Sequence, residues 1–221
     1  MPAALSVLAV IGSIHLLAQL LGSALVADIT QVLLMPLLAA ALWRGTRPPR
    51  DTLVRLTLLA LGFSWLGDTI PRFLDGDPGF LGMLGSFLGA QLVYPIAFWP
   101  RWRRSLLVRP LAVLPYLLVA AAVVVLSAPG AGVLLPAVMV YAGVLCVMAL
   151  LATGLGRLGG LGGAMFIVSD SLIALDAFGT LTLPAHSVWV MATYLAAQVM
   201  LVLAVRGRIP PAAGGAQGGT S

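Results

Sequence analysis

The stretch Phe63-Ser64-Trp65-Leu66-Gly67-Asp68-Thr69 places a carboxylate inside an apolar run that is long enough to cross a bilayer. A related stretch, Phe166-Ile167-Val168-Ser169-Asp170-Ser171, follows about a hundred residues later. An ionisable group at membrane depth costs about 2.5 to 3.5 kcal/mol on insertion scales, so it is rarely kept without a partner or a task. The two aspartates therefore predict a functional site inside a membrane domain.

Composition places the chain among polytopic membrane proteins. Of its 221 residues, 61% are hydrophobic and 9% are charged, which is far from the usage of soluble domains. The charged residues are 12 arginines and 7 aspartates, with no lysine and no glutamate. Positive-inside orientation explains the basic excess better than a nucleic-acid partner does, because no stretch interleaves arginines with stacking aromatics. The single Cys146 excludes an intrachain disulfide.

Apolar runs separated by turn signals predict an all-α bundle of eight transmembrane helices. A bilayer core about 30 Å thick takes roughly 20 helical residues. By that measure the predicted spans are 3–22, 26–43, 53–71, 79–99, 106–127, 131–152, 161–178 and 186–205. Together they form one membrane domain over 1–206, integral and multi-pass, in the inner membrane if the source is bacterial. Residues 207–221, rich in Gly, Pro and Ala, are predicted to form a disordered cytoplasmic tail.

The arginines predict the orientation of the helices. Eleven of the twelve follow an even-numbered predicted span, and only Arg72 lies on the opposite side. Because cytoplasmic loops carry an excess of arginine, this distribution predicts that both termini are cytoplasmic.

A weak internal repeat also runs through the chain, between 1–104 and 105–206. The corresponding residues are Pro36, Asp68 and Gln91 in the first half and Pro136, Asp170 and Gln198 in the second. A parallel duplication of four spans would bring equivalent helices face to face, and the two aspartates with them. The alternative is that such residues recur by chance in any membrane chain.

Asp68 has two interpretations. Ser64, Asp68 and Arg72 are spaced by four residues and share one helix face, so Asp68 and Arg72 could form an ion pair at the outer interface. A site role is favoured for two reasons. Gly67 opens space beside the carboxylate for another helix or a ligand, and Pro71 removes the usual donor to the Gly67 carbonyl, an irregularity expected beside a cavity.

Asp170 has no cation within helical reach, and its neighbours Ser169 and Ser171 can donate hydrogen bonds to it. Apolar surroundings disfavour a charged carboxylate and prepare such a group to act as a general acid. The structural alternative is a neutral aspartate that holds helices together through hydrogen bonds.

Further polar residues form stripes on the predicted helices and are either ligand contacts or contacts between helices. The candidate substrate-binding residues are Ser64, Gln91, Tyr94, Ser169, Tyr194 and Gln198. His15 is expected to be a packing partner and His186 a loop residue. Two distant histidines and no glutamate make a zinc hydrolase improbable, so neither a metal nor a cofactor is expected.

The chain resembles the YhhN family of membrane proteins over nearly its whole length. The motifs that carry the resemblance are Leu33-Leu34-Met35-Pro36-Leu37-Leu38, Phe63-Ser64-Trp65-Leu66-Gly67-Asp68, Gln91-Leu92-Val93-Tyr94, Ala164-Met165-Phe166-Ile167-Val168-Ser169-Asp170-Ser171 and Tyr194-Leu195-Ala196-Ala197-Gln198. The family pattern has eight spans. It commonly carries a lysine where this chain has Gln31 and a histidine where it has Gln91.

The animal members of the family are lysoplasmalogenases, so the resemblance implies hydrolysis of the vinyl-ether bond of a lysoplasmalogen or related lysophospholipid. The products would be a fatty aldehyde and a glycerophospho-ethanolamine or -choline. By analogy with paired carboxylates in glycosidases, Asp170 is expected to act as the acid and Asp68, near Arg72, as the base or stabiliser. The expected partners are this substrate and membrane lipids, without nucleic acid; the sequence predicts no oligomeric state.

A rival hypothesis is a proton-coupled transporter or lipid-binding protein in which the same two aspartates carry protons. A partner-dependent scaffold is a third, but it leaves the buried aspartates unexplained.

Overall fold

The computed structural model describes residues 2–209, and most of the predicted tail lies outside them. The described chain is helical, without strands, which confirms the all-α prediction. Its α-helices are α1 (Pro2–Leu20), α2 (Ala24–Arg44), α3 (Thr52–Thr69), α4 (Gly76–Phe98), α5 (Pro110–Ala131), α6 (Leu135–Ala152), α7 (Arg157–Ala177) and α8 (His186–Arg206).

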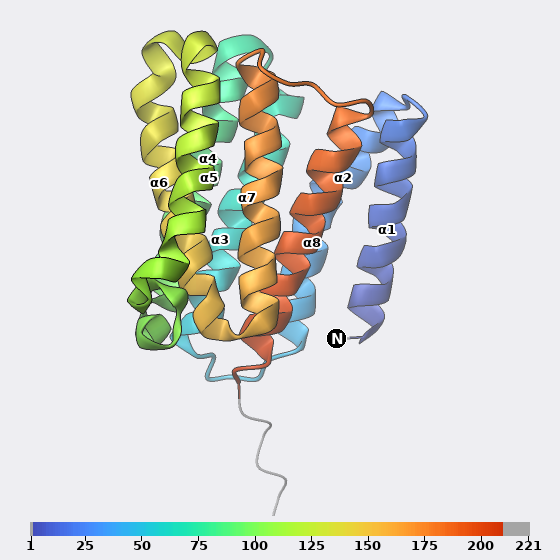
Figure 1. The fold of residues 1–221 in the computed structure, drawn as a ribbon. Coiled ribbons are helices and arrows are strands. Elements are labelled where there is room, and N and C mark those ends of the chain that lie inside the picture. The colour runs from blue at the N-terminus through green and yellow to red at the C-terminus, as the bar shows by residue number, and fades with distance from the viewer. Residues whose placement is uncertain (1, 210–221) are drawn as a thin grey trace, which may run out of the picture.

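Seven helical segments in the described residues are long and apolar enough to cross a membrane, so the chain is a multi-pass membrane protein. Six of them contain one of the helices α1 to α4, α7 and α8. The seventh, Pro110–Leu155, is 46 residues long and contains both α5 and α6. Between these two helices the chain turns back through Gly132, whose φ of +49° favours glycine, and α5 and α6 pack side by side (Figure 1).

The helices stand roughly parallel, and α1 begins at the same end of the bundle at which α8 ends (Figure 1). The strongest pairings join α7 to α8, α3 to α4 and α1 to α2. α4 also contacts α6, which contacts α7 in turn. α1 packs along one edge of the bundle against α2 and α8, whereas α5 packs along the other against α6 and α7.

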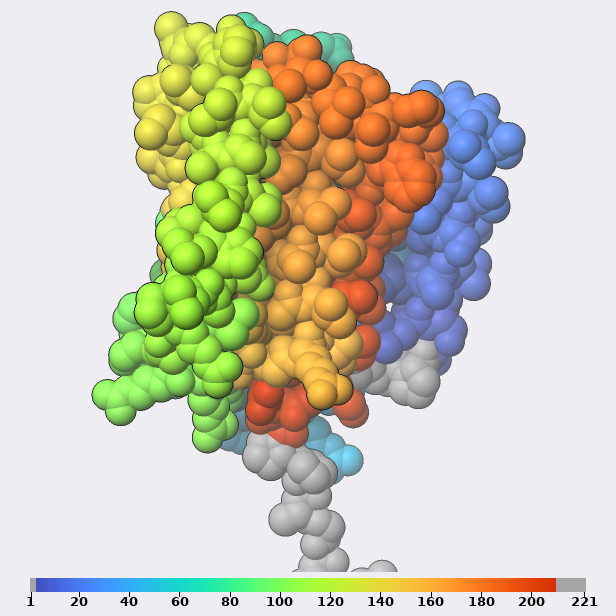
Figure 2. All heavy atoms as spheres, viewed as in Figure 1, coloured from blue at the N-terminus to red at the C-terminus, as the bar shows by residue number. Residues whose placement is uncertain are grey.

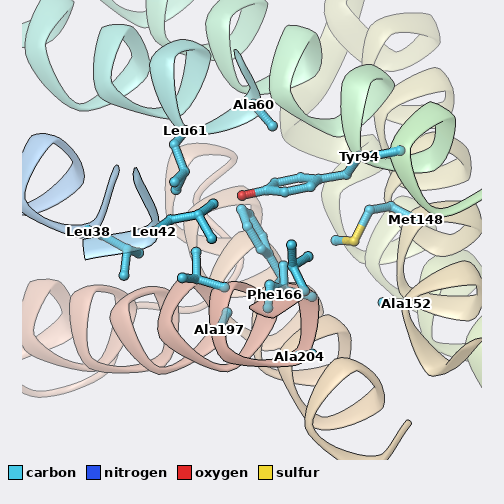
Figure 3. Close-up of a cluster of buried hydrophobic side chains, with 14 of the residues drawn as sticks. Leu38, Leu42, Ala60, Leu61, Tyr94, Met148, Ala152, Phe166, Ala197 and Ala204 are labelled. Atoms are coloured by element: carbon cyan, nitrogen blue, oxygen red, sulfur yellow. The ribbon is translucent and has the colours of Figure 1, made fainter. Parts of the chain in front are cut away.

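The core lies between α2, α3, α4, α6, α7 and α8. Figure 3 shows side chains from all six helices meeting there, including Leu42, Leu61, Tyr94, Met148 and Phe166, all at most 1% exposed. The two outer helices contribute little to it; in α5 only Ser127 and Ala131 are buried, and many apolar side chains are exposed. Such a surface suits a helix that faces lipid.

Close approach of α3 and α4 depends on glycine. A Cβ on Gly67 would lie 2.8 Å from the ring of Phe87, and one on Gly89 would lie 2.8 Å from the ring of Phe63. The expectation that Gly67 makes room for another helix is therefore confirmed, and the helix that uses the space is α4.

Three helices begin four residues away from the predicted start of their span. α5 begins at Pro110 instead of 106, because Leu106–Val108 form a separate 3-10 turn and proline suits the first helical position. α7 begins at Arg157 instead of 161; its glycines allow α6 to approach, since a Cβ on Gly163 would lie 2.8 Å from the Cα of Ala149. α6 begins at Leu135 instead of 131, because Gly132–Leu134 form a 3-10 turn. His186, expected in a loop, is the first residue of α8, where the predicted span 186–205 begins.

Candidate functional site

A cavity of about 410 Å³ lies toward the end of the bundle where α3 ends and α8 begins. We call it the polar cavity because charged and amide side chains stand among its largely apolar lining. Its lining comes from α1, α2, α3, α4, α7 and α8 and from the turn after α3. Asp68 and Asp170 both line it, so the two carboxylates share one cavity, as the sequence led us to expect.

Asp68 is 3% exposed and is held by two donors from other helices. The hydroxyl of Tyr194 on α8 donates to Oδ2 at 2.9 Å, and Nε2 of Gln31 on α2 donates to Oδ1 at 3.3 Å. Both donors also line the polar cavity. Two donors stabilise a carboxylate and fix its orientation.

Arg72 does not pair directly with Asp68, which corrects the ion pair considered from the sequence. The α-helix ends at Thr69, and Ile70–Arg72 form a 3-10 turn that carries Arg72 off the expected helix face. Its guanidinium forms a 2.5 Å ion pair with Asp28 and donates to Oε1 of Gln31 at 2.7 Å. Gln31 therefore bridges Arg72 and Asp68.

Asp170 is 9% exposed and accepts a 2.6 Å hydrogen bond at Oδ2 from the hydroxyl of Tyr141 on α6. Its neighbour Ser169 lines the polar cavity but donates to the backbone carbonyl of Val190 at 3.1 Å. Ser169 thus ties α7 to α8, and the donor to the carboxylate comes from another helix.

Gln91 on α4 is fully buried beside Asp170 and Tyr141. Within the described residues, neither atom of its amide has a hydrogen-bond partner of good geometry. Gln91 does not line the polar cavity, so it is a buried polar neighbour of the Asp170–Tyr141 pair.

Three predicted substrate-binding residues form a network of their own. The hydroxyl of Tyr94 donates to Oε1 of Gln198 at 2.6 Å, and Nε2 of Gln198 donates to Ser64 Oγ at 2.9 Å. All three are fully buried, and none of them lines the polar cavity. The network joins α3, α4 and α8 and positions the helices that carry Asp68 and its donor Tyr194.

The two histidines have different surroundings. His15 is buried, and its Nδ1 lies 2.9 Å from Thr30 Oγ1 and 3.1 Å from the Ala27 carbonyl, which fits the packing role expected for it. His186 lines the polar cavity with its Nε2 3.9 Å from Asp176.

A second, apolar hollow of about 80 Å³ lies between α4, α5, α6 and α7. We call it the apolar slot. Asp170 is the only charged residue among the described residues that line it. The residues that line both the slot and the polar cavity are Phe80, Met83, Phe87, Asp170, Ile173 and Ala177. Asp170 therefore stands where the cavity that holds the charged and amide side chains meets a space with no other charged residue in its described lining.

Sequence reasoning missed two residues of the site, Gln31 and Tyr141. Gln31 was noted only as a departure from a family pattern, and Tyr141 lies in an apolar run with no polar neighbour at helical spacing. The one available signal was that tyrosine is rare in this chain, with 4 in 221 residues. Three of the four hydrogen-bond to a site aspartate or to Gln198.

The fold and the site define a multi-pass membrane protein with two buried carboxylates in one cavity, a pair suited to acid–base chemistry. The model of the YhhN family matches residues 26–205, and the chain belongs to that family. A search of curated proteins gave no match. A search of solved structures gave none either.

Proposed function

We propose that the protein is a membrane hydrolase that cleaves the vinyl-ether bond of a lysoplasmalogen or a related lysolipid. The observation that carries the proposal is the position of Asp170 between the polar cavity and the apolar slot. A lysolipid has one polar headgroup and one hydrocarbon chain, joined by the bond to be cleaved. The two spaces match the two parts of such a molecule, with a carboxyl group at the junction.

The polar cavity also suits a headgroup in its chemistry. Arg72, Gln31, Asp176 and His186 line it and offer donors, acceptors and charge of both signs. The apolar slot offers mainly aliphatic and aromatic surface. Membership of the YhhN family is consistent with this activity.

The reaction divides into steps that two carboxyl groups can perform. Asp170 gives its proton to the β-carbon of the vinyl ether, the carbon–carbon π bond breaks, and an oxocarbenium ion forms at the carbon attached to oxygen. A water molecule attacks that carbon and loses a proton, which gives a hemiacetal. The hemiacetal then loses the glycerol oxygen, which takes up a proton, and the remaining carbonyl is the fatty aldehyde. One water is consumed and no redox change occurs.

The surroundings of the two carboxyl groups support different roles for them. Asp68 accepts from Gln31 and Tyr194, and the positive Arg72 stands beyond Gln31. Asp68 thus has more partners that stabilise a charge than Asp170 has, which supports its role in stabilising the cation or taking the proton of water. Asp170 accepts from the neutral Tyr141 at Oδ2, which leaves Oδ1 to carry the proton that is transferred. Gln91 is buried beside Asp170 and Tyr141 and lines neither space, so it is placed to orient this pair.

We also propose that the chain crosses the membrane eight times with both ends in the cytoplasm. A single straight helix over Pro110–Leu155 would be roughly 69 Å long, more than twice the bilayer core, so α5 and α6 are two crossings. The connections at the end where α1 begins join α2 to α3, α4 to α5 and α6 to α7 (Figure 1). These connections and the helix turns that flank them hold nine of the 12 arginines, as expected for the cytoplasmic side.

The test is aldehyde release from purified protein given a panel of vinyl-ether lysophospholipids that differ in headgroup. Asp170→Asn and Asp68→Asn should each abolish release while thermal unfolding stays close to that of the wild type, because asparagine keeps the shape of the side chain. Asp77→Asn is the control, since Asp77 lies in the first turn of α4 and lines neither space. Turnover retained by folded Asp170→Asn would exclude the acid role of Asp170.

The rival transport function gives a different result in the same material. A transporter would move lipid or protons across sealed vesicles and leave every lipid intact. Flux without covalent change, lost in the same two variants, would replace the hydrolase proposal.

A further inference from the structure

The apolar slot extends past Asp170 and ends at two facing residues, Tyr116 on α5 and Cys146 on α6. Each of these lies six residues from its helix end on the side where α1 begins, whereas Asp170 lies thirteen residues from that end of α7. At 1.5 Å per residue, the slot continues roughly 10 Å beyond the carboxyl group.

Past Cys146 the slot is closed by the core. Met148, Leu151 and Ala152 follow on α6 and are all 0% exposed, so α6 offers no opening there. On its outer side the slot is covered by α5, which lies along α7 in Figure 2 and contacts it. Leu118 and Val125 on α5 are both 69% exposed and do not line the slot, so α5 is a wall one helix thick between the slot and the surrounding lipid.

We propose that the slot holds the single hydrocarbon chain of the lysolipid and that Tyr116 and Cys146 set the longest chain that binds fully. This inference rests on the proposed function for the position of the reactive bond at Asp170. With the bond fixed there, the distance from Asp170 to the closed end limits the length of the hydrocarbon chain that fits. A chain that is too long holds the reactive bond away from Asp170.

Cys146 is the only cysteine in the sequence, so its thiol reports on occupancy of the closed end. The protein, in nanodiscs of a diacyl phosphatidylcholine, is treated with the small uncharged reagent methyl methanethiosulfonate, and labelling is followed by intact mass. The ligands are lysophosphocholines with saturated 1-O-alkyl chains of graded length, which lack the double bond that the proposed reaction protonates. Short chains should leave the thiol reactive. Chains long enough to reach it should slow labelling about tenfold at roughly ten times their dissociation constant, because only empty sites react.

A matched pair of alanines locates the effect in the slot. Ala120 on α5 lines the slot between the levels of Asp170 and Tyr116, whereas the adjacent Ala121 is exposed on the outer face. Ala120→Phe should fill the slot below Asp170, so that long alkyl chains no longer protect Cys146 and the longest vinyl-ether chain cleaved becomes shorter. Ala121→Phe should behave as the wild type in both measurements.

The inference is overturned if protection does not depend on chain length, if both phenylalanine variants act alike, or if the lipid-free thiol does not react and the slot therefore does not reach it. These results are distinct from failure of the proposed function. If protection depends on chain length but no vinyl ether is cleaved, the hydrolase proposal fails and the slot still stands as the binding site of the hydrocarbon chain. If aldehyde is released but no chain protects Cys146, the hydrolase proposal stands and the chain site in the slot is wrong.

Discussion

The hydroxyl of Tyr141 on α6 donates a 2.6 Å hydrogen bond to the carboxyl group of Asp170 on α7. The hydroxyl of Tyr194 on α8 makes the equivalent contact with Asp68 on α3, at 2.9 Å. Each aspartate of the polar cavity is thus held by a phenol from another helix, and the two pairs are separated by 29 and 126 residues in the sequence. The site exists only when these four helices pack together.

Removing the Tyr141 hydroxyl should lower activity and leave the fold intact. Tyr141→Phe keeps the ring but leaves Asp170 without its donor, so we expect the rate of aldehyde release to fall roughly ten- to hundred-fold, as befits loss of a hydrogen bond to a catalytic acid. Thr193→Val is the control, because it also removes a hydroxyl, one that donates only within α8 and lines neither space. Equal rates in the two variants would show that the contact with Tyr141 does not orient Asp170.

Gln31 should matter because it joins Arg72 to Asp68. Gln31→Met keeps the size of the side chain and removes both hydrogen bonds, which leaves part of a guanidinium and part of a buried carboxyl group unpaired. We expect a loss of about 1 to 3 kcal/mol in stability together with reduced turnover, measured by thermal unfolding and aldehyde release. An unchanged melting temperature and rate would mean that water replaces the amide at no cost.

We expect the network of Ser64, Tyr94 and Gln198 to affect the free energy of unfolding more than the rate of aldehyde release. Gln198→Leu leaves the Tyr94 and Ser64 hydroxyls buried without partners and should destabilise by about 1 to 3 kcal/mol for each unpaired group. Adding Tyr94→Phe removes one of these orphaned hydroxyls, so the double variant should lose less than the sum of the two single losses. Additive losses, or a change in KM without a change in unfolding, would argue instead for direct contact with substrate.

Gly67 provides a steric prediction. Gly67→Ala would place a methyl group 2.8 Å from the Phe87 ring, forcing α3 and α4 apart, and should destabilise by about 1 to 3 kcal/mol. Gly62→Ala, in the same helix with nothing within 4 Å of its Cβ, should instead gain up to about 1 kcal/mol. In a Phe87→Leu background the stability lost through Gly67→Ala should be smaller. Thermal unfolding of Gly67→Ala, Gly62→Ala, Phe87→Leu and the double variant Gly67→Ala/Phe87→Leu tests this.

Much of the fold could be predicted from the sequence. Apolar runs bounded by glycine, proline and arginine located the helices to within a few residues at most ends, because a helix in lipid must satisfy its own backbone and needs a fixed length. The misplaced start of α7 shows the limit of such reading. The glycine-rich stretch Gly154 to Gly160 signals a turn in isolation, yet Gly159 and Gly160 lie in the first turn of α7, where the end of α6 packs closely against them.

The candidate site was predicted only in part. Asp68 and Asp170 stood out because a carboxyl group in an apolar run is costly wherever it packs. Arg72 was expected to face Asp68 because the spacing assumed a continuous α-helix. The 3-10 turn at Ile70–Arg72 changes the direction in which Arg72 leaves the helix. Its guanidinium therefore contacts Asp28 and Gln31 instead.

The sequence by itself determined that this is a membrane protein, where its helices run and which two carboxyl groups lie within them, since these properties depend on composition and local spacing. Only the tertiary structure decided which residues hold Asp68 and Asp170, and that Asp170 stands between a polar cavity and an apolar slot. The physical reason is that lateral packing of helices depends on how each one is rotated about its axis. In this chain glycine contacts such as Gly67 with Phe87 set that packing, and no pattern within a single helix encodes it.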